Sequence, residues 1–291
     1  MLSVVLPKGS LEEATLDLFT AADLAVRRGT DRDYHASIDD PRVERVRFLR
    51  PQEIPVYVEE GLFDLGITGR DWIAETGSDV VSLGELQYSR ATSRPVRIVL
   101  AVPASDQIEH GADLSDGVRV STEYPRLTRE FFAAAGVKAV VVPSYGATEA
   151  KVPDIVDAIV DVTETGSSLR GAGLKIVETL LTSYTELIAN KTAYADPDKR
   201  AAMEDLALLL RGAIRARGAV LLKLNVARDD LARVLEIIPS AGSPTLMMLA
   251  SGTQSAVEAV VPKAGINELI PALKAAGAFD ILELAIGKIV D

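Results

Sequence analysis

A run of small hydroxyl residues around one glycine is the most chemically suggestive feature of this sequence. In DAIVDVTETGSSLRGAGL, residues 157–174, an apolar segment typical of a buried strand leads into Thr163, Thr165, Gly166, Ser167 and Ser168. Hydroxyls and backbone N–H groups without an intrahelical partner bind anions, and a glycine lets the main chain approach closely. The turn therefore predicts a site for a phosphate monoester.

Two carboxylates, Asp157 and Asp161, stand in the strand before this turn, although a phosphate would repel them. A carboxylate accepts hydrogen bonds from sugar hydroxyls, so Asp161 suits the ribose that carries the phosphate. The ordinary alternative is a loop that caps a helix and binds nothing. No GKS or GKT follows, and the spacing GxGxxG is absent, so the turn is neither a P-loop nor a dinucleotide fingerprint.

Other candidates also lie where a predicted strand ends. Lys8 follows the apolar segment LSVVLP, GITGRD (residues 66–71) is a second strand and glycine turn, and Tyr124 precedes a helix that opens on Pro125. Each has a plain alternative: an exposed lysine, an ordinary turn or a packing aromatic. Ligands of open α/β sheets bind outside the carboxyl ends of the strands. These features therefore predict one cleft between two facing sheets.

Strand patterns alternate with helical patterns through the first 217 residues, which is typical of parallel, doubly wound sheets. A connection, SRATSRP at residues 89–95, precedes a fresh series that starts at VRIVLAVP. We therefore expect two α/β lobes, residues 1–90 with 182–217 and residues 91–181. The last of these segments is a long helix after Asp196, with one apolar stripe formed by Met203, Leu206, Leu210 and Ala213.

The pattern changes after Gly218. The segments AVLLKLNV, RDDLARVLEIIP, PTLMMLA, SAVEAVVP, GINELIPALKAAGA and DILELAIGKIV follow the order strand, helix, strand, strand, helix, strand. This βαββαβ order is that of a ferredoxin-like domain. We expect residues 218–291 to form such a module behind the two-lobed core.

Composition excludes several classes of protein. The chain has 291 residues and no cysteine, so it has neither a disulfide framework nor a thiolate site. His35 and His110 are far apart among polar residues, and the net charge of −11 disfavours a nucleic-acid partner. MLSVVLPKGS lacks the basic start of a signal peptide, and no apolar run approaches the ~20 residues of a membrane span. We expect a cytoplasmic protein.

Three motifs in order, LPKGSL, FLRPQEIPVYVEEGLFDLGITGRDW and VDAIVDVTETGSSL, resemble the ATP phosphoribosyltransferase family. The resemblance runs the full length, because LNV and GSPTLMML resemble the histidine-binding regulatory domain of the long form. It implies a core like that of type II periplasmic binding proteins, with the site between the lobes. The implied reaction joins adenine N1 of ATP to C1 of phosphoribosyl pyrophosphate (PRPP), the first step of histidine biosynthesis.

The resemblance also implies partners and site residues. Mg²⁺ accompanies pyrophosphate, histidine inhibits by feedback, AMP is a further candidate inhibitor, and the family forms dimers and hexamers. The implied PRPP ligands are Asp157, Asp161, Thr163, Thr165, Gly166, Ser167 and Ser168. The implied ATP ligands are Arg50, Gly69, Arg70, Asp71 and Tyr124. The implied catalytic residues are Lys8, Glu149 and Asp161. The implied effector residues are Asn225, Ser243, Pro244 and Thr245.

Three positions depart from the family's pattern. Ser168 replaces the usual threonine but keeps the hydroxyl, so we expect binding to survive. Glu164 stands before the phosphate turn, and we expect its side chain to point outward, since it would otherwise repel phosphate. Glu283 stands in the last strand where an apolar residue is expected, in the module that would hold the effector.

The implied chemistry needs no strong acid–base pair, because adenine N1 is already a nucleophile. Pyrophosphate leaves with negative charge, which cations stabilise. We expect Lys8, Arg50, Arg70 and magnesium to make the cleft positive. Two alternatives use the same lobes without catalysis: a small-anion binding protein, disfavoured by the extra tail, and a ligand-sensing domain, disfavoured because no basic helix pair is evident.

Overall fold

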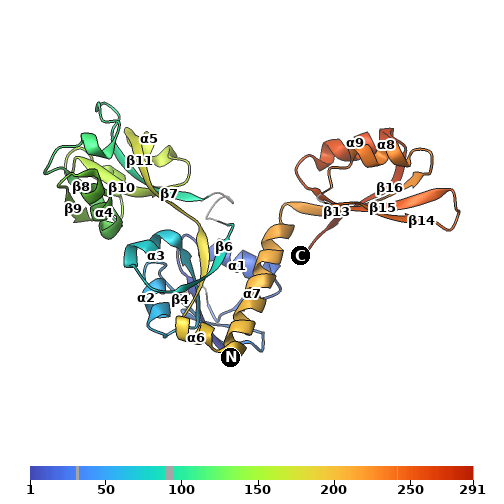
Figure 1. The fold of residues 1–291 in the computed structure, drawn as a ribbon, viewed down its shortest axis with the longest axis horizontal. Coiled ribbons are helices and arrows are strands. Elements are labelled where there is room, and N and C mark those ends of the chain that lie inside the picture. The colour runs from blue at the N-terminus through green and yellow to red at the C-terminus, as the bar shows by residue number, and fades with distance from the viewer. Residues whose placement is uncertain (31–32, 89–94, 241, 291) are drawn as a thin grey trace. The chain divides into compact units, whose positions relative to one another are not determined.

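A computed structural model describes residues 1–30, 33–88, 95–240 and 242–290. The chain forms two compact units, one of residues 1–20 with 24–207 and one of residues 21–23 with 208–291 (Figure 1). The first unit contains a seven-stranded and a five-stranded sheet, and the second contains a four-stranded sheet. The connection expected at residues 89–95 lies outside the described residues except for Pro95.

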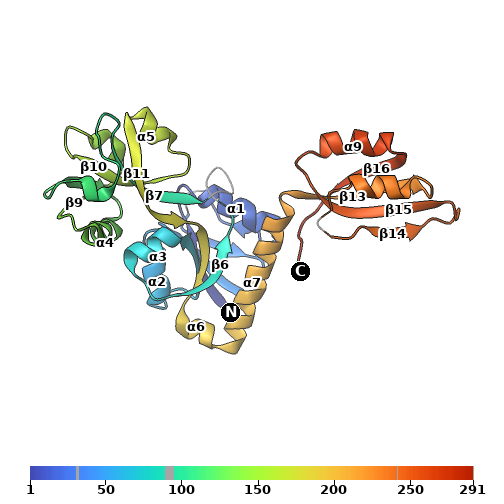
Figure 2. The ribbon, with the colours of Figure 1, turned by 45° about the horizontal axis from the view of Figure 1, so that its top comes forward.

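The seven-stranded sheet forms the first lobe. Its order is β2-β3-β4-β1-β5-β12-β6. Its strands are β1 (Leu2–Pro7), β2 (Val26–Arg27), β3 (His35–Ile38), β4 (Val43–Leu49), β5 (Leu65–Gly69), β6 (Val81–Leu86) and β12 (Thr185–Ala189). Helices α2 (Ile54–Glu59) and α3 (Arg70–Thr76) cover one face, and α1 (Glu12–Ala21) covers the other (Figure 2). Every residue of β1 and β5 is buried, as expected of central strands covered on both faces.

The five-stranded sheet forms the second lobe, in the order β11-β7-β10-β8-β9. Its strands are β7 (Val96–Pro103), β8 (Arg119–Thr122), β9 (Val140–Pro143), β10 (Ala158–Thr163) and β11 (Leu174–Ser183). Its helical segments are η1 (Gly111–Asp113), α4 (Pro125–Ala135), η2 (Thr148–Lys151) and α5 (Ser167–Gly171).

The two sheets repeat one topology. In each, a central strand pairs in parallel with one neighbour on either side: β1 with β4 and β5, and β8 with β9 and β10. Next to them lies an antiparallel strand that enters from the other lobe, β12 beside β5 and β7 beside β10. The predicted two-lobed α/β core is confirmed. The expectation of purely parallel sheets is wrong, because the strand that crosses between lobes enters its sheet in the opposite direction.

Other differences concern local boundaries. The segment GLKIVETLLTSYTELIAN (residues 173–190), whose apolar pattern predicts one strand, forms two, β11 and β12, with Tyr184 between them. The segment PQEIPVYVEEG (residues 51–61) predicts a helix that opens on Pro51, but α2 begins at Ile54, with Pro55 in its first turn, because residues 51–53 form a separate turn. The edge strands β2 and β3 were not predicted. They are short and only partly buried, so they lack the apolar run that marks the other strands.

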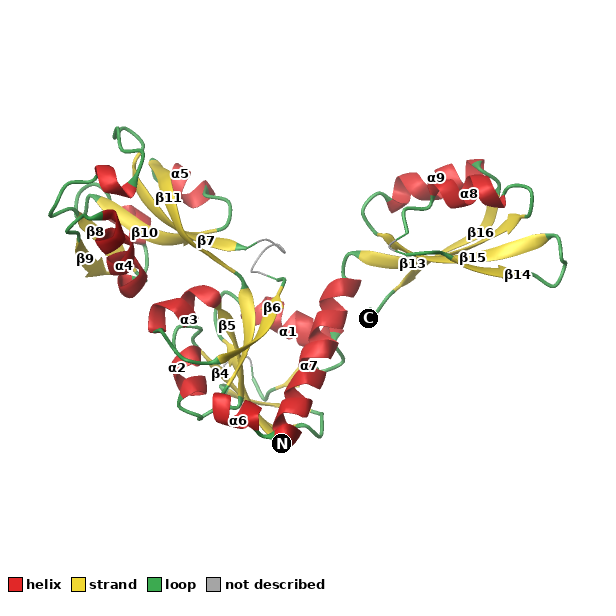
Figure 3. Cartoon of the chain, in the orientation of Figure 1, coloured by secondary structure: helices red, strands yellow, loops and turns green. Residues whose placement is uncertain are grey.

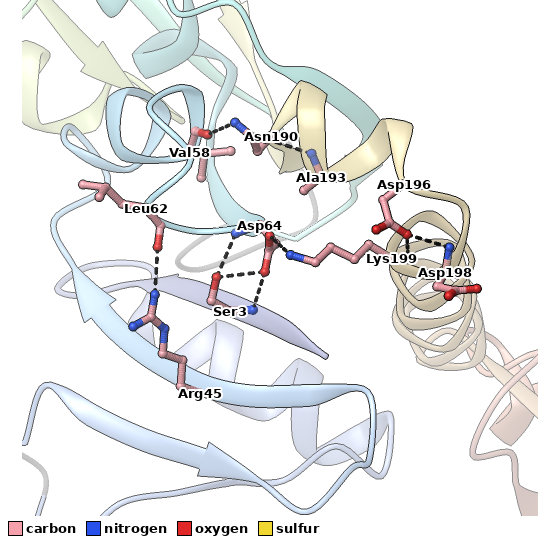
Figure 4. A network of polar contacts seen from close by, with 10 residues as sticks. All are labelled: Ser3, Arg45, Val58, Leu62, Asp64, Asn190, Ala193, Asp196, Asp198 and Lys199. Atoms are coloured by element: carbon pink, nitrogen blue, oxygen red, sulfur yellow. Dashed lines mark hydrogen bonds and ion pairs between the residues drawn. The ribbon is translucent and has the colours of Figure 1, made fainter.

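A polar network fastens α6 (Lys191–Ala195) and the start of α7 (Pro197–Ala216) to the first lobe (Figure 4). Asp64 accepts hydrogen bonds from Ser3 N, Ser3 Oγ and Lys199 Nζ at 2.8, 2.9 and 2.8 Å. The Asp196 carboxylate caps α7 by accepting from two backbone N–H groups, as expected of an N-cap. The predicted stripe Met203, Leu206, Leu210 and Ala213 is buried.

The C-terminal unit has the predicted βαββαβ order. Its elements are β13 (Ala219–Ala227), α8 (Leu231–Ile237), β14 (Thr245–Met248), β15 (Gln254–Pro262), α9 (Ile266–Ala275) and β16 (Ala278–Ala285). The sheet order is β14-β15-β13-β16, with every pair antiparallel. Both helices lie on one face of this sheet (Figure 3), and alternate residues of β13 are buried against them. The ferredoxin-like prediction is confirmed.

In the described part of the chain, none of the helices is both long and apolar enough to cross a membrane.

Candidate functional site

A cavity of about 920 Å³ lies within the first unit, at the carboxyl ends of strands of both lobes. Among the residues that line it, those of the first lobe include Lys8, Tyr34, Arg50, Gln52, Glu53, Gly69, Asp71, Trp72 and Tyr88. Those of the second lobe include Glu123, Tyr124, Val162, Thr163, Glu164, Thr165, Ser167 and Ser168. The residues Ser183, Tyr184 and Thr185, where the chain crosses between lobes, complete the wall. The cavity is large enough for a nucleotide-sized ligand.

The hydroxyl-rich turn joins β10 to α5 and forms part of this wall. Thr163 Oγ1 accepts from Gly166 N at 2.8 Å, which closes the turn. Thr165 Oγ1 donates to Ser167 Oγ at 3.0 Å, and both residues are exposed. Ser168 is exposed as well. The turn therefore presents a cluster of hydroxyls to the cavity, the donor set that a phosphate requires.

Gly166 permits this turn because its φ is +75°, a left-handed conformation that side chains disfavour. A Cβ at this position would lie 2.9 Å from Arg170 Nη1 and 3.1 Å from Ile176 Cδ1. Gly166 does not itself line the cavity. Its role is to shape the backbone that presents Thr165 and Ser167.

Asp161 lies on β10, two residues before Thr163, and is half-buried. Burial raises the pKa of its carboxyl from 3.8 to about 6. The hydrogen bond that Val162 N donates to it at 2.7 Å lowers the pKa but does not outweigh burial. The negative charges of Glu149 and Glu123 raise this pKa further, whereas Lys151 lowers it. The structure thus brings together acids from three neighbouring segments: Glu123 directly after β8, Glu149 in the first turn of η2 and Asp161 in β10.

The first lobe offers cations and an unsatisfied polar atom. Lys8 Nζ lies 4.3 Å from the centre of the Tyr34 ring, a cation–π contact at the cavity wall. Arg50 follows β4 and is exposed. Gln52 Oε1 is buried without a hydrogen-bond partner, alone in this respect among the described side chains. A buried acceptor without a partner costs stability unless something satisfies it.

Asp71 and Tyr124 join the two lobes. The Tyr124 hydroxyl donates to Asp71 Oδ2 at 2.8 Å, and Ser183 Oγ donates to Asp71 Oδ1 at 2.6 Å. Burial raises the pKa of Asp71, although these two hydrogen bonds lower it. Burial also raises the pKa of Tyr124, well above its usual range. Asp71 is therefore a carboxylate whose oxygens are already engaged by the protein.

The structure brings most predicted substrate ligands to the cavity but not all. Arg70 Nε donates to Glu186 Oε1 at 2.6 Å, and its guanidinium lies 3.3 Å from Glu85, so it pairs within the first sheet. Asp157 lies before β10, about 20 Å along the strand from the turn, and accepts from Arg119 N at 2.8 Å. Neither residue lines the cavity, and the same holds for the predicted catalytic residues Glu149 and Asp161. Asp157 therefore caps the start of a neighbouring strand instead of facing the phosphate turn.

Sequence reasoning missed several residues of the wall. Glu123 stands at the end of β8, directly before Tyr124, and its place beside Asp161 could have been inferred from the strand-end rule that was applied to Tyr124. Gln52 and Trp72 stand inside the quoted motif at residues 48–72 but were assigned no role, and Tyr34 belongs to no motif. Glu164 is half-buried and lines the cavity, which gives no support to the expectation that its side chain points outward.

The predicted effector residues lie in the second unit. Asn225 Nδ2 donates to Asp280 Oδ2 at 3.1 Å within the central part of the sheet. Ser243 and Thr245 are exposed, and Thr245 begins the edge strand β14. Strand β15 separates β14 from β13, so Asn225 is about 10 Å from the β14 strand. Glu283 is exposed and therefore needs no apolar surroundings.

Within the described ranges, no three His, Asp or Glu side chains gather so that they could hold a metal ion. The donors of the cavity wall are instead scattered carboxylates, those of Glu53, Glu123 and Glu164. Such a wall fits a Mg²⁺ ion that keeps its waters and is held mainly by substrate phosphates.

These features define a class of protein: a two-lobed α/β protein whose cavity presents a hydroxyl-rich turn on one lobe, followed by a ferredoxin-like module. Comparisons with known proteins narrow this class. The ATP phosphoribosyltransferase family model matches residues 50–212, and the model of the HisG C-terminal domain matches residues 216–288. The chain belongs to the ATP phosphoribosyltransferase family and is accordingly a transferase of the long form, as predicted.

Curated relatives extend over the whole chain. An ATP phosphoribosyltransferase of Chlorobium luteolum is 48% identical over 291 residues, which are 100% of this chain and 98% of that protein. One of Pelotomaculum thermopropionicum is 47% identical over 287 residues, 98% of each chain. Among solved structures, the ATP phosphoribosyl transferase (HisG:HisZ) complex from Thermotoga maritima matches at a TM-score of 0.63 with 24% identity. That match covers 74% of this chain and 99% of the other, and it supports the fold.

Proposed function

We propose that the cavity joins ATP to PRPP, releasing pyrophosphate and forming N1-(5-phosphoribosyl)-ATP, the first step of histidine biosynthesis. The observation that carries this proposal is one cavity with a hydroxyl-lined turn on one lobe and cationic and aromatic side chains on the other. A phosphorylated sugar and a purine nucleotide could each bind one wall and meet between them. Membership of the ATP phosphoribosyltransferase family supports the same reaction.

The 5-phosphate of PRPP would bind the hydroxyls of Thr165, Ser167 and Ser168, on a turn shaped by Gly166. The Asp161 carboxylate would accept hydrogen bonds from the ribose hydroxyls. As pyrophosphate departs, positive charge develops at the anomeric carbon, and the acidic group formed by Asp161, Glu149 and Glu123 would stabilise it. A site that only bound phosphate would not need these carboxylates. Stabilising the positive charge on the ribose gives them a role.

The leaving pyrophosphate needs cations. Lys8 and Arg50 lie on the cavity wall of the first lobe, and neither belongs to a salt bridge among the described residues. Bound Mg²⁺ would neutralise charge on the pyrophosphate oxygens. Arg70 pairs with Glu186 and Glu85, which compensate its charge, so it would not be a direct ligand.

The purine would bind beside Gln52, Trp72 and Tyr124. Gln52 Oε1 lacks a hydrogen-bond partner, and the exocyclic amine next to adenine N1 is a donor that would satisfy it. The stacked rings of Trp72 and Tyr124 form an apolar surface nearby. Adenine N1 then attacks C1 of the ribose in line, and holding the two substrates in this pose supplies most of the rate enhancement.

The C-terminal module would bind histidine at Ser243, Pro244 and Thr245, with Asn225 as a further ligand, and AMP would compete in the cavity. A homo-oligomer, dimeric or hexameric, would bring two such modules together. Exposed apolar side chains on both edge strands support assembly, namely Leu246, Met247, Met248, Phe279, Leu282 and Leu284. We propose a cytoplasmic location and the domain bounds 1–90 with 182–217, 91–181 and 218–291, which the membership of β12 and β7 in their sheets supports.

The direct test is to mix the protein with ATP, PRPP and Mg²⁺ and to measure pyrophosphate release. We expect release that requires all three and that added histidine inhibits. A two-lobed anion-binding protein or a sensing domain would bind a substrate without releasing pyrophosphate, and that outcome would reject the proposed reaction.

A further inference from the structure

Helix α3 of the first lobe and helix α4 of the second are joined by one carboxylate. Glu75 Oε1 accepts from Arg126 N at 2.9 Å, and Glu75 Oε2 accepts from Leu127 N at 3.0 Å. The first N–H groups of a helix have no intrahelical partner. Tyr124, the N-cap residue of α4, provides no side-chain hydrogen bond to them. The cap of α4 therefore comes from the other lobe.

Trp72 contacts the second lobe from the same helix. It lies three residues before Glu75, so the two side chains share one face of α3. Its ring stacks on that of Tyr124 with centroids 4.6 Å apart and planes 27° from parallel. It also packs against the buried apolar core of the second lobe, beside residues such as Leu100 and Phe132. One helix of the first lobe thus holds the second lobe by an apolar and a polar contact.

We infer that Glu75 is a positioning residue that fixes the second lobe against the first for phosphoribosyl transfer. The inference rests on the proposed function, in which PRPP is held by the turn at Thr165 while Lys8 lies across the cavity. Glu75 does not line the cavity, so it acts through α4 and Tyr124 and not by touching a substrate. Because the reacting atoms belong to substrates on different lobes, a small change in lobe orientation would misalign them.

The chain supplies a matched control in Glu130. Its carboxylate accepts from Arg126 Nε at 2.8 Å within α4, four residues away, and both side chains are about half exposed. Both glutamates thus contact Arg126. Glu75 binds its backbone N–H from the other lobe, whereas Glu130 binds its guanidinium from within α4. Removing it changes a surface ion pair only.

Two variants test the role, Glu75→Ala and the milder Glu75→Gln, which keeps one acceptor oxygen. Trp72 is the single tryptophan of the chain, so its fluorescence reports on the contact between the lobes without any substrate. We expect Glu75→Ala to make Trp72 more accessible to acrylamide quenching, Glu75→Gln to have a smaller effect, and Glu130→Ala to match the wild type. Unchanged quenching in folded Glu75→Ala would overturn the inference.

Kinetics supply the second measurement. We expect Glu75→Ala to lower kcat by about 10- to 100-fold, as misplaced reacting groups do, with partial recovery in Glu75→Gln. Ribose 5-phosphate binding measured calorimetrically without ATP should stay near the wild-type value, because its phosphate would contact only the turn, which belongs wholly to the second lobe. A wild-type kcat, or an equal loss in Glu130→Ala, would contradict the positioning role. If the wild type itself releases no pyrophosphate, the proposed function fails, and the quenching experiment still decides whether Glu75 fixes the lobes.

Discussion

Tyr124 on the second lobe donates its phenolic hydrogen to Asp71 on the first lobe, across 2.8 Å, with both side chains buried. Both residues were predicted to bind ATP. In the structure their polar atoms satisfy each other, so neither side chain presents a free polar group. The pair therefore links the two lobes at the wall of the cavity.

The first prediction concerns this pair. Tyr124→Phe should lower the free energy of unfolding by about 1–3 kcal/mol, because it leaves a buried carboxylate oxygen without its donor. Denaturation in urea measures the change. Tyr57→Phe is the matched control, since the Tyr57 hydroxyl makes an exposed contact of 3.5 Å with Glu53. Equal stability of Tyr124→Phe and wild type would contradict the structural role of the bond.

The second prediction concerns the pH dependence that Asp161 imparts. Its pKa of about 6 means that the free enzyme takes up a proton as the pH falls through 6. If the ionised form holds the ribose, kcat/KM for PRPP should then fall about tenfold per pH unit below 6. The folded pKa exceeds the ordinary value of 3.8, so this group's contribution to stability decreases as the pH rises from about 4 to about 6.

Asp161→Asn supplies the control. This variant should have a low kcat/KM for PRPP at every pH. Its kcat/KM should also fall less steeply than that of the wild type below pH 6, because only the titration of the PRPP phosphate remains. It should also unfold at a higher urea concentration than wild type at pH 7, because no ionised carboxylate is then half-buried. An unaltered acid limb in Asp161→Asn would assign the titration to another group.

The third prediction compares two glycines near the phosphate turn. Gly166→Ala should raise the KM for PRPP by about tenfold or more, because a Cβ forces the left-handed backbone to shift at the cost of about 1 kcal/mol or more. Gly171→Ala should have little effect, since a Cβ there would meet no heavy atom within 4 Å and its φ is ordinary. Steady-state kinetics with each substrate varied in turn measure both. A larger effect on the KM for ATP would place the sugar phosphate elsewhere.

The fourth prediction concerns the anchor of α7. Burial raises the pKa of Asp64, but hydrogen bonds from Lys199 and Ser3 outweigh it and hold the pKa below 3.8. Because the folded pKa is depressed, the stabilisation is present above about pH 4 and is lost as the pH falls through the folded value. Lys199→Met should cost about 1–2 kcal/mol at pH 7, at the low end for a charged hydrogen bond because Lys199 is 35% exposed.

Lys191→Met is the matched control for Lys199→Met. Lys191 pairs with Asp79, and both side chains are mostly exposed, so the expected loss is within about 0.5 kcal/mol. Urea denaturation at a series of pH values falling from 7 compares the two variants. Equal losses at pH 7, or a Lys199→Met loss that does not shrink as the Asp64 carboxylate is titrated, would show that the anchor does not depend on the Asp64 charge.

The fifth prediction concerns the effector. The double variant Ser243→Ala and Thr245→Val should raise the histidine concentration needed for half inhibition about tenfold or more, since each lost hydrogen bond costs about 1 kcal/mol. Activity without histidine should stay unchanged, because both residues are exposed in the second unit. Unaltered inhibition would mean that histidine binds elsewhere.

The sequence by itself determined most of the elements and the hydroxyl-rich turn after β10, because these depend on neighbours in the chain. Apolar runs between glycine turns mark strands such as β1 and β5, and the βαββαβ order of the last quarter follows from local pattern alone. The turn at Gly166 was predicted for the same reason, since its hydroxyls and its glycine are consecutive.

The tertiary structure decided which strand-end residues share the cavity and which are engaged elsewhere. Arg70 pairs with Glu186, Asp71 with Tyr124, and Asp157 caps a neighbouring strand; each partner comes from a distant segment. Local pattern gives a residue's type and its place on an element. The partner that a charged side chain meets depends on strand register and on the crossing of the chain between lobes. Only the folded structure sets these two.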